Sequence, residues 1–272
     1  MKTINKIRIS QPCFFISMGM LLLVLGVSWF FESYFAEVMF FMDYNAPDLV
    51  GIADAKSILL KSVLTWERFI DASMRYVVNI FPLFAVLPVI PFCFERKIYF
   101  IFGAARFHNY GRELYCAILK YSIWGGICIS VGFSIYFSAA SLFMVPSVND
   151  IGGFSSIFPT DFYSNHPYLF FLFLSVSIYF AVGVVFSGMA CAIALYTDKE
   201  FYMLTLPILV YIGDSYLGYT IDFLPFKISE SVCAFNTLYT TGQIFIPLLP
   251  LAIIDILLIV FGVRNRRKAV DL

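Results

Sequence analysis

Long runs of apolar residues alternate with short charged segments along this chain. Six runs are long enough to cross the hydrocarbon core of a bilayer, which needs about 20 helical residues. Hydrocarbon cannot satisfy backbone polar groups, so we expect helices here and not the short alternating strands of a barrel. The pattern predicts spans at about residues 12–31, 76–94, 121–145, 168–196, 201–221 and 244–263, all within a single transmembrane domain of residues 1–272.

The composition supports the same interpretation. Hydrophobic residues make up 61% of the chain and charged residues only 13%, whereas a soluble protein has about 25% charged residues. So few ionic side chains cannot solvate a folded exterior, but a bilayer accepts an apolar exterior. The composition excludes a water-soluble domain and predicts an all-α integral membrane protein, a bundle of six transmembrane helices.

The charged residues are divided unequally between the two sides of the predicted bundle. With a cytoplasmic N-terminus, thirteen Lys and Arg residues lie on the inner side and five on the outer side, and eleven of the eighteen acidic residues lie in outer segments. Inner connections of membrane proteins carry an excess of Lys and Arg. We therefore expect both termini to be cytoplasmic, in a multi-pass protein of the cell membrane.

Several function classes are excluded by what the sequence lacks. The net charge is zero, which excludes a generally basic surface for a nucleic-acid partner. The six cysteines form no CxxC pattern and have no interleaved histidines, so neither a metal site nor a disulfide framework is indicated. P-loop, HExxH and GxSxG sequences are absent. We expect no catalytic residues and no cofactor in this chain.

The connections between the predicted spans differ in length. The first outer loop covers residues 32–75, and apolar residues at near-helical spacing within 52–69 predict a small helical outer subdomain. Residues 95–120 form a basic cytoplasmic loop, and 106–120 alternate charged with apolar and aromatic residues. That pattern is typical of an amphipathic helix at the inner interface, although a solvated loop also explains the charges. Only residues 197–200 join the fourth and fifth spans.

Two acidic residues, Asp214 and Asp255, lie inside predicted spans. A charge at the centre of a span costs about 2.5–3.5 kcal/mol on insertion scales, so such residues face an interior, a cavity or a partner. At about 1.5 Å per residue, Asp255 lies about 12 Å and Asp214 about 20 Å from the inner end of its helix, which does not favour a paired proton relay. Hydrogen bonding between helices is the structural interpretation, and for Asp214 a position near the outer interface.

The fourth span has a stripe of small side chains at spacings of three and four residues. Its members are Gly183, Ser187, Ala190 and Ala194. This spacing places them on one helical face, where the backbone of a neighbouring helix can approach closely. We expect a helix-packing face rather than a ligand site.

The overall arrangement resembles the permease subunit of a bacterial type 2 ATP-binding-cassette (ABC) transporter, with six spans and a cytoplasmic segment before a glycine-containing third span. In that family an acidic residue, a short apolar stretch, a basic residue, Tyr and Lys form the coupling helix that contacts the ATPase. The matching positions are Glu95, Arg96, Arg106, Tyr110, Arg112, Glu113 and Lys120, followed by Gly125 and Gly126. Asp198 and Lys199, in the other short inner connection, are the second candidate contact. Residues 222–243 resemble the short helices that dip into the outer leaflet in this family, with Pro225 and Phe226 at the turn.

The resemblance implies a function and a set of partners. The chain forms half of a translocation pathway, pairs with a second copy or a related permease in membrane lipid, and relies on separate ATPase subunits that bind ATP and Mg²⁺. The long first loop is more like permeases of Gram-positive bacteria that handle peptides or antibiotics, so the expected activity is export of a peptide, antibiotic or lipid-like substrate.

Two alternatives remain open at the level of the sequence. One is a proton-coupled secondary transporter or channel that uses Asp214 and Asp255. The other is a non-transporting immunity or scaffold protein that binds a partner through the outer loop at residues 32–75.

Overall fold

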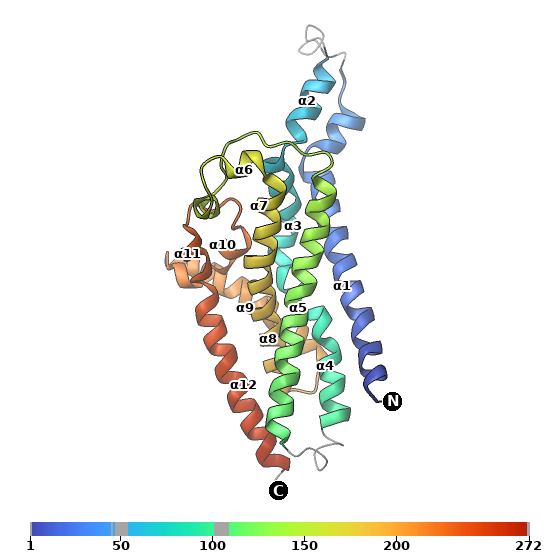
Figure 1. Ribbon diagram of the computed structural model, residues 1–272, viewed down its shortest axis with the longest axis vertical. Coiled ribbons are helices and arrows are strands. Elements are labelled where there is room, and N and C mark those ends of the chain that lie inside the picture. Colours follow the sequence, from blue (N-terminus) through green and yellow to red (C-terminus); the bar gives the residue numbers. More distant parts are fainter. Residues whose placement is uncertain (1, 45, 47–53, 101–108, 271–272) are drawn as a thin grey trace.

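The computed structural model describes residues 2–44, 46, 54–100 and 109–270 (Figure 1). Helix accounts for 82% of the structure, and no β-strand occurs in these ranges. Six helical segments are long and apolar enough to cross a membrane, which is the architecture of a multi-pass membrane protein. The expectation of an all-α protein with six spans is confirmed. Both ends of the chain lie toward the same end of the bundle (Figure 1), as an even number of spans requires.

The six segments are built from helices that follow one another along the chain. They are α1 (Lys2–Glu32); α3 (Trp66–Val86) with η2 (Leu87–Val89), α4 (Ile90–Glu95) and the start of η3 (Arg96–Phe100); α5 (Tyr110–Ala140); α7 (Pro167–Leu174) with η6 (Ser175–Tyr179) and α8 (Phe180–Tyr196); α9 (Glu200–Thr220); and α11 (Thr241–Phe245) with α12 (Leu248–Val270).

Two of these helices begin earlier than the apolar runs predict. α3 begins at Trp66 rather than at residue 76, and α5 begins at Tyr110 rather than at residue 121. Both early segments are amphipathic: in α3, Phe69 and Ile70 are buried while Arg68 is exposed. Exposed charges lower the mean hydropathy without interrupting the helix. Part of each predicted loop, 32–75 and 95–120, is therefore helix, and within 106–120 the described residues from Tyr110 onward are the start of α5, continuous with the third span.

The second span is interrupted by prolines. Pro82 lies within α3, where Ile80 departs from helical geometry with φ −122° and ψ 15°. Pro88 and Pro91 then begin the short helices η2 and α4. Proline has no N–H to donate and its ring clashes with the preceding turn, so Pro82 accounts for the kink at Ile80, whereas Pro88 and Pro91 lie in first turns, where proline is tolerated. The broken span brings its last residues, Glu95 and Arg96, beneath neighbouring helices.

Helix α8 is the central helix of the bundle and packs against α5, α12, α9 and α3. Its contact with α5 depends on glycines on both sides. A Cβ added at Gly183 would lie 2.9 Å from the Cα of Gly126, and one added at Gly125 would lie 1.8 Å from the Ser187 Oγ. The Ser187 hydroxyl donates a hydrogen bond of 2.8 Å to the Ala85 carbonyl on α3. Close backbone approach of this kind is typical of membrane helix packing.

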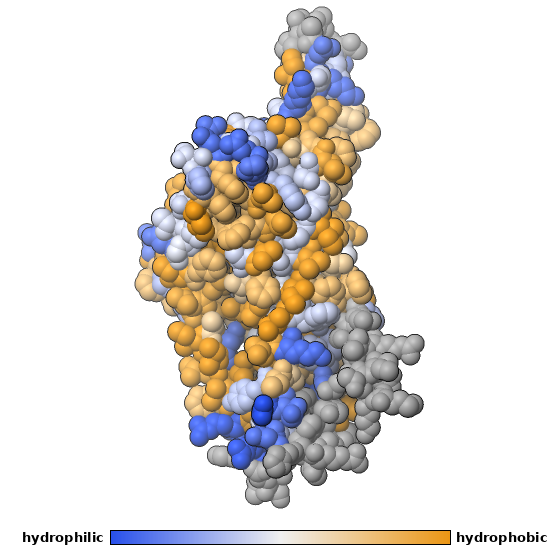
Figure 2. Space-filling view, viewed as in Figure 1, coloured by the Kyte–Doolittle hydropathy of each residue, from blue (hydrophilic) through white to orange (hydrophobic). Residues whose placement is uncertain are grey.

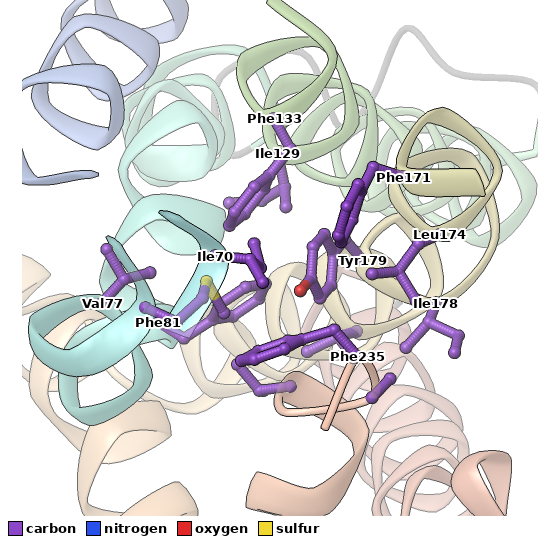
Figure 3. Packing of buried hydrophobic residues seen from close by; sticks show 14 of the residues in the cluster. Ile70, Val77, Phe81, Ile129, Phe133, Phe171, Leu174, Ile178, Tyr179 and Phe235 are labelled. Atoms are coloured by element: carbon purple, nitrogen blue, oxygen red, sulfur yellow. The ribbon is translucent and has the colours of Figure 1, made fainter. Parts of the chain in front are cut away.

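The main core is aromatic and lies among α3, α5, α7 and α8 (Figure 3). The rings of Phe133 and Tyr179 have centroids 4.3 Å apart, and Phe81 stacks on Phe133 at 6.0 Å. A second, smaller cluster includes Ala190 and Ala194 of the small-residue stripe, both buried. Aromatic pairs of this geometry add stabilisation beyond the area they bury. They therefore stabilise the packing of the helices between the two ends of the bundle.

The two ends of the bundle differ in chemistry. We call the end that holds Arg96, Arg112, Asp198 and Arg266 the basic end. The opposite, far end carries several short elements: η1 (Glu37–Phe41), α2 (Ala55–Val63), η5 (Gly153–Ile157), α6 (Phe162–Asn165), η7 (Leu224–Phe226) and α10 (Ile228–Val232). α2 confirms a helix within residues 52–69 and extends away from the bundle (Figure 1). Between the two ends the visible surface is largely hydrophobic (Figure 2).

Candidate functional site

Arg96 is a buried cation at the basic end. It follows α4 as the first residue of η3 and has 1% of its surface exposed. Its Nη2 donates a hydrogen bond to the Asp198 carboxylate and another, of 3.1 Å, to the Thr197 carbonyl, while Nε and Nη1 have no partner among the described residues. A buried charge is tolerated only when it is paired and hydrogen-bonded. Arg96 thereby fixes the connection between α8 and α9 to the end of the second span.

Asp198 is shared with a third helix. The Arg266 Nη2 on α12 lies 3.9 Å from the Asp198 Oδ1, and the Arg266 Nε donates a hydrogen bond of 2.9 Å to the Leu195 carbonyl at the end of α8. The hydrogen bond from the Arg96 guanidinium, with its positive charge, lowers the pKa of Asp198 below its ordinary value. One carboxylate therefore joins the basic ends of the second, fourth and sixth spans.

Two further contacts brace the same region. The Lys97 Nζ lies 3.3 Å from the Glu200 Oε1 on α9, and the Tyr121 hydroxyl donates a hydrogen bond of 2.8 Å to Glu95 from α5. Together with the contacts of Arg96 and Asp198 they tie five of the six spans to one cluster. Here the basic-end cluster means Glu95, Arg96, Lys97, Asp198, Glu200 and Arg266.

The other predicted coupling residues lie on α5 and in the α8–α9 connection. Tyr110 is half-buried, whereas Arg112, Glu113, Lys120 and Lys199 are exposed. Asn109 caps α5, because its side-chain oxygen accepts a hydrogen bond of 3.3 Å from the Arg112 backbone N–H. Arg106 lies outside the described residues. The structure thus separates the predicted residues into the buried Arg96 with its exposed partner Asp198, and a set of exposed residues on α5 and at Lys199.

The first turns of α5 and the end of α12 enclose a cavity of about 400 Å³. Arg112, Cys116 and Arg264 line it. Its lining places one exposed basic residue of α5, Arg112, beside Arg264 of α12 at the same end. An acidic surface of a partner is the complement of such a region.

Sequence reasoning did not identify Arg266, Lys97 or Glu200 as site residues. In the sequence they are only charged residues in or near the predicted inner connections. Their positions at the ends of spans are the one signal that groups them. Their partners lie far along the chain: Arg266 contacts Leu195 across 71 residues, and Lys97 contacts Glu200 across 103. Such pairs are decided by packing and not by local sequence.

The two intramembrane acids lie in different surroundings. Asp255 on α12 has 4% of its surface exposed, and neither carboxylate oxygen has a hydrogen-bond partner in the described part of the chain. It lines a groove of about 440 Å³ between α5, α8 and α12. Asp214 on α9 is half-buried and does not line that groove. The structure therefore does not bring Asp214 and Asp255 to one cavity.

In comparisons with known proteins, no family model, no curated protein and no solved structure is significantly similar to this chain. The family resemblance rests on the residues quoted above.

Proposed function

We propose that the chain is the permease subunit of a type 2 ABC transporter in the bacterial cell membrane. In this role it forms half of a translocation pathway and couples to a separate ATPase that binds ATP and Mg²⁺. A second copy of the chain, or a related permease, supplies the other half. The substrate class is an exported peptide, antibiotic or lipid-like molecule.

The observation that carries the proposal is the tie between Arg96 and Asp198. Under the proposed topology, these residues lie in the two connections that face the cytoplasm between spans. Arg266 extends the tie to the last helix. A force applied at either connection is therefore transmitted to α4, α8, α9 and α12 together. Transport by alternating access needs such rigid movement of a group of helices.

The residues of the basic end take two roles in this proposal. Arg112, Glu113, Lys120 and Lys199 are exposed and are the described side chains available for direct contact with the ATPase. We assign Arg106 to the same contact from its place in the sequence alone. Arg96 is buried and Asp198 holds it, so we assign to these two the transmission of movement and not the contact itself.

A reconstituted complex tests this assignment. Arg106→Glu and Arg112→Glu should lower transport and the stimulation of ATP hydrolysis by the permease, because each reverses a charge at the proposed contact. The assay needs an ABC ATPase that forms a complex with this chain, so co-purification of such a subunit with the tagged chain is its first step. Lys61→Glu is the matched control, because Lys61 is an exposed cation on α2 at the far end. Undiminished transport and ATPase stimulation in both charge-reversed variants would overturn the proposal.

The source of energy separates this proposal from a proton-driven carrier. Transport by the permease requires ATP hydrolysis in the partner and continues when an uncoupler removes the proton gradient. Transport that persists without ATP and stops with the uncoupler would favour the carrier instead. A proton-driven carrier of this kind would use Asp214 and Asp255 together, but Asp214 does not line the groove that Asp255 lines.

A further inference from the structure

The Asp255 carboxyl group is buried within a membrane-spanning helix and has no hydrogen-bond partner among the described residues. Its two oxygens accept no hydrogen bond from any described residue. Ser122 lines the same groove, and its hydroxyl donates a hydrogen bond of 2.9 Å to the Ile118 carbonyl. A carboxylate in hydrocarbon is costly unless it meets a cation or a donor. The part of the chain that the structure describes supplies neither to Asp255.

Asp255 lines a groove between three helices. The groove of about 440 Å³ runs between α5 and α12, with α8 behind them (Figure 1), and its volume is within the range of about 300–1,000 Å³ for ligand sites. Gly188 on α8 makes the space: a Cβ there would lie 3.7 Å from the Asp255 Oδ2 and 3.5 Å from the Ser122 Oγ. The carboxyl group thus points from α12 toward α8, at the buried floor of the groove that Asp255 lines.

The walls of the groove define the rest of the ligand. They are apolar apart from Tyr115, Ser122 and Asp255, and include Leu119, Val184, Ile256 and Val260. Leu119 and Ile256 are each 60% exposed on the sides of membrane-spanning helices, so the groove opens toward the lipid. One buried anion in an apolar groove is complementary to a single cation on an apolar body.

We propose that the groove between α5, α8 and α12 binds a lipophilic amine that enters from the membrane, with Asp255 as the counter-ion of its ammonium group. The ammonium donates hydrogen bonds to the Asp255 oxygens, and the alkyl or aryl body lies against Leu119, Val184 and Ile256. This chain alone supplies all the residues of the site. The binding proposal can therefore be tested, and can fail, independently of the proposed partnership with an ATPase.

Binding of a twelve-carbon primary amine, radiolabelled dodecylamine, tests the proposal. The full-length chain is placed in phosphatidylcholine nanodiscs, whose zwitterionic lipid does not capture the amine by charge. We expect saturable binding that dodecanol, an alcohol of the same chain length, does not displace. Saturable binding that dodecanol displaces as well as unlabelled dodecylamine, or no saturable binding, would overturn the proposal. This comparison uses the unaltered chain and does not depend on the folding of any variant.

Three variants locate the site. Asp255→Asn keeps the shape of the side chain and should weaken amine binding about tenfold or more, the effect of removing one partner of a buried charge pair. Asp214→Asn is the matched control, because it removes the other intramembrane carboxylate and should leave binding unchanged. Ala252→Phe fills the groove from α12 without altering the charge and should also weaken binding.

Two results from these variants would contradict the assignment. The first is unaltered amine binding in Asp255→Asn. The second is a dimer, measured by mass photometry, that dissociates on Asp255→Asn while amine binding is unchanged. That result would assign the groove to a second copy of the chain.

Discussion

The buried guanidinium of Arg96 donates a hydrogen bond to the carboxylate of Asp198, a residue 102 positions later in the chain. The side chain of Arg96 is 2% exposed and that of Asp198 is 67% exposed. The pair is therefore asymmetric: the cation depends on the carboxylate for its charge compensation, whereas the carboxylate can also be solvated.

Removing the charge of Asp198 should destabilise the basic end. We expect Asp198→Asn to lower the free energy of unfolding by about 1–3 kcal/mol, the cost of leaving a buried charged donor without its partner. The buried Cys93, three residues before Arg96, reports the change locally. Its labelling by a maleimide, followed by mass spectrometry, should become faster in Asp198→Asn.

The far end offers a matched control for this prediction. Asp222 is an exposed carboxylate that pairs with the largely buried Lys227, only five residues away. Asp222→Asn removes the same kind of pair without touching the basic end. Equal labelling of Cys93 in both variants and in the unaltered chain would show that the tie does not hold α4 in place.

The same pair predicts a dependence of stability on pH. The pKa of Asp198 is lowered by the hydrogen bond and charge of Arg96, so the folded chain holds this proton less tightly than the unfolded chain does. The stabilisation is complete above the ordinary Asp pKa of about 3.9 and is lost as the pH falls through the lower folded value. Thermal unfolding in detergent between about pH 6 and pH 3 should show a smaller loss for Asp198→Asn than for the unaltered chain. Parallel curves would contradict the prediction.

The contact between α5 and α8 predicts that adding a methyl group to Gly125 destabilises the chain. The new Cβ of Gly125→Ala would lie 1.8 Å from the Ser187 Oγ and 2.7 Å from the Ala85 carbonyl oxygen, so the helices must separate. Overpacking of this kind costs about 1–3 kcal/mol. Gly26→Ala on α1 is the control, because nothing lies within 4 Å of its added Cβ. The thermal midpoint in detergent should fall in the first variant and stay level or rise slightly in the second.

Glu67 at the start of α3 holds the segment that follows α5. Its carboxylate accepts hydrogen bonds from the Ser147 and Val148 backbone N–H groups, at 3.0 and 3.2 Å, and from the Tyr163 hydroxyl at 2.8 Å. Hydrogen bonds to a charged group contribute about 1.5–3 kcal/mol. Glu67→Gln should therefore speed proteolysis within residues 141–165. Asp71→Asn, at an exposed position one turn further along α3, should not. Similar cleavage rates for the two variants would remove this role from Glu67.

The number and order of the membrane-crossing helices could be predicted from the sequence, whereas their ends could not. Each apolar run must satisfy its own backbone in hydrocarbon, so its length alone indicates a helix. α3 and α5 extend beyond their apolar runs because their first turns have one apolar and one charged face. In these turns Phe69 is buried and Arg68 is exposed, although hydropathy averages the two.

The sequence by itself determined that this chain is a helical membrane protein with six spans, because the transfer of an apolar run into lipid is a local property. Only the tertiary structure distinguished Arg96, which is buried against Asp198, from Arg112, which is exposed. It likewise distinguished Asp255, which faces an open groove, from Asp214, which does not. Within each pair the residue type is the same, and the difference arises from neighbours on other helices, whose positions depend on packing across the whole bundle.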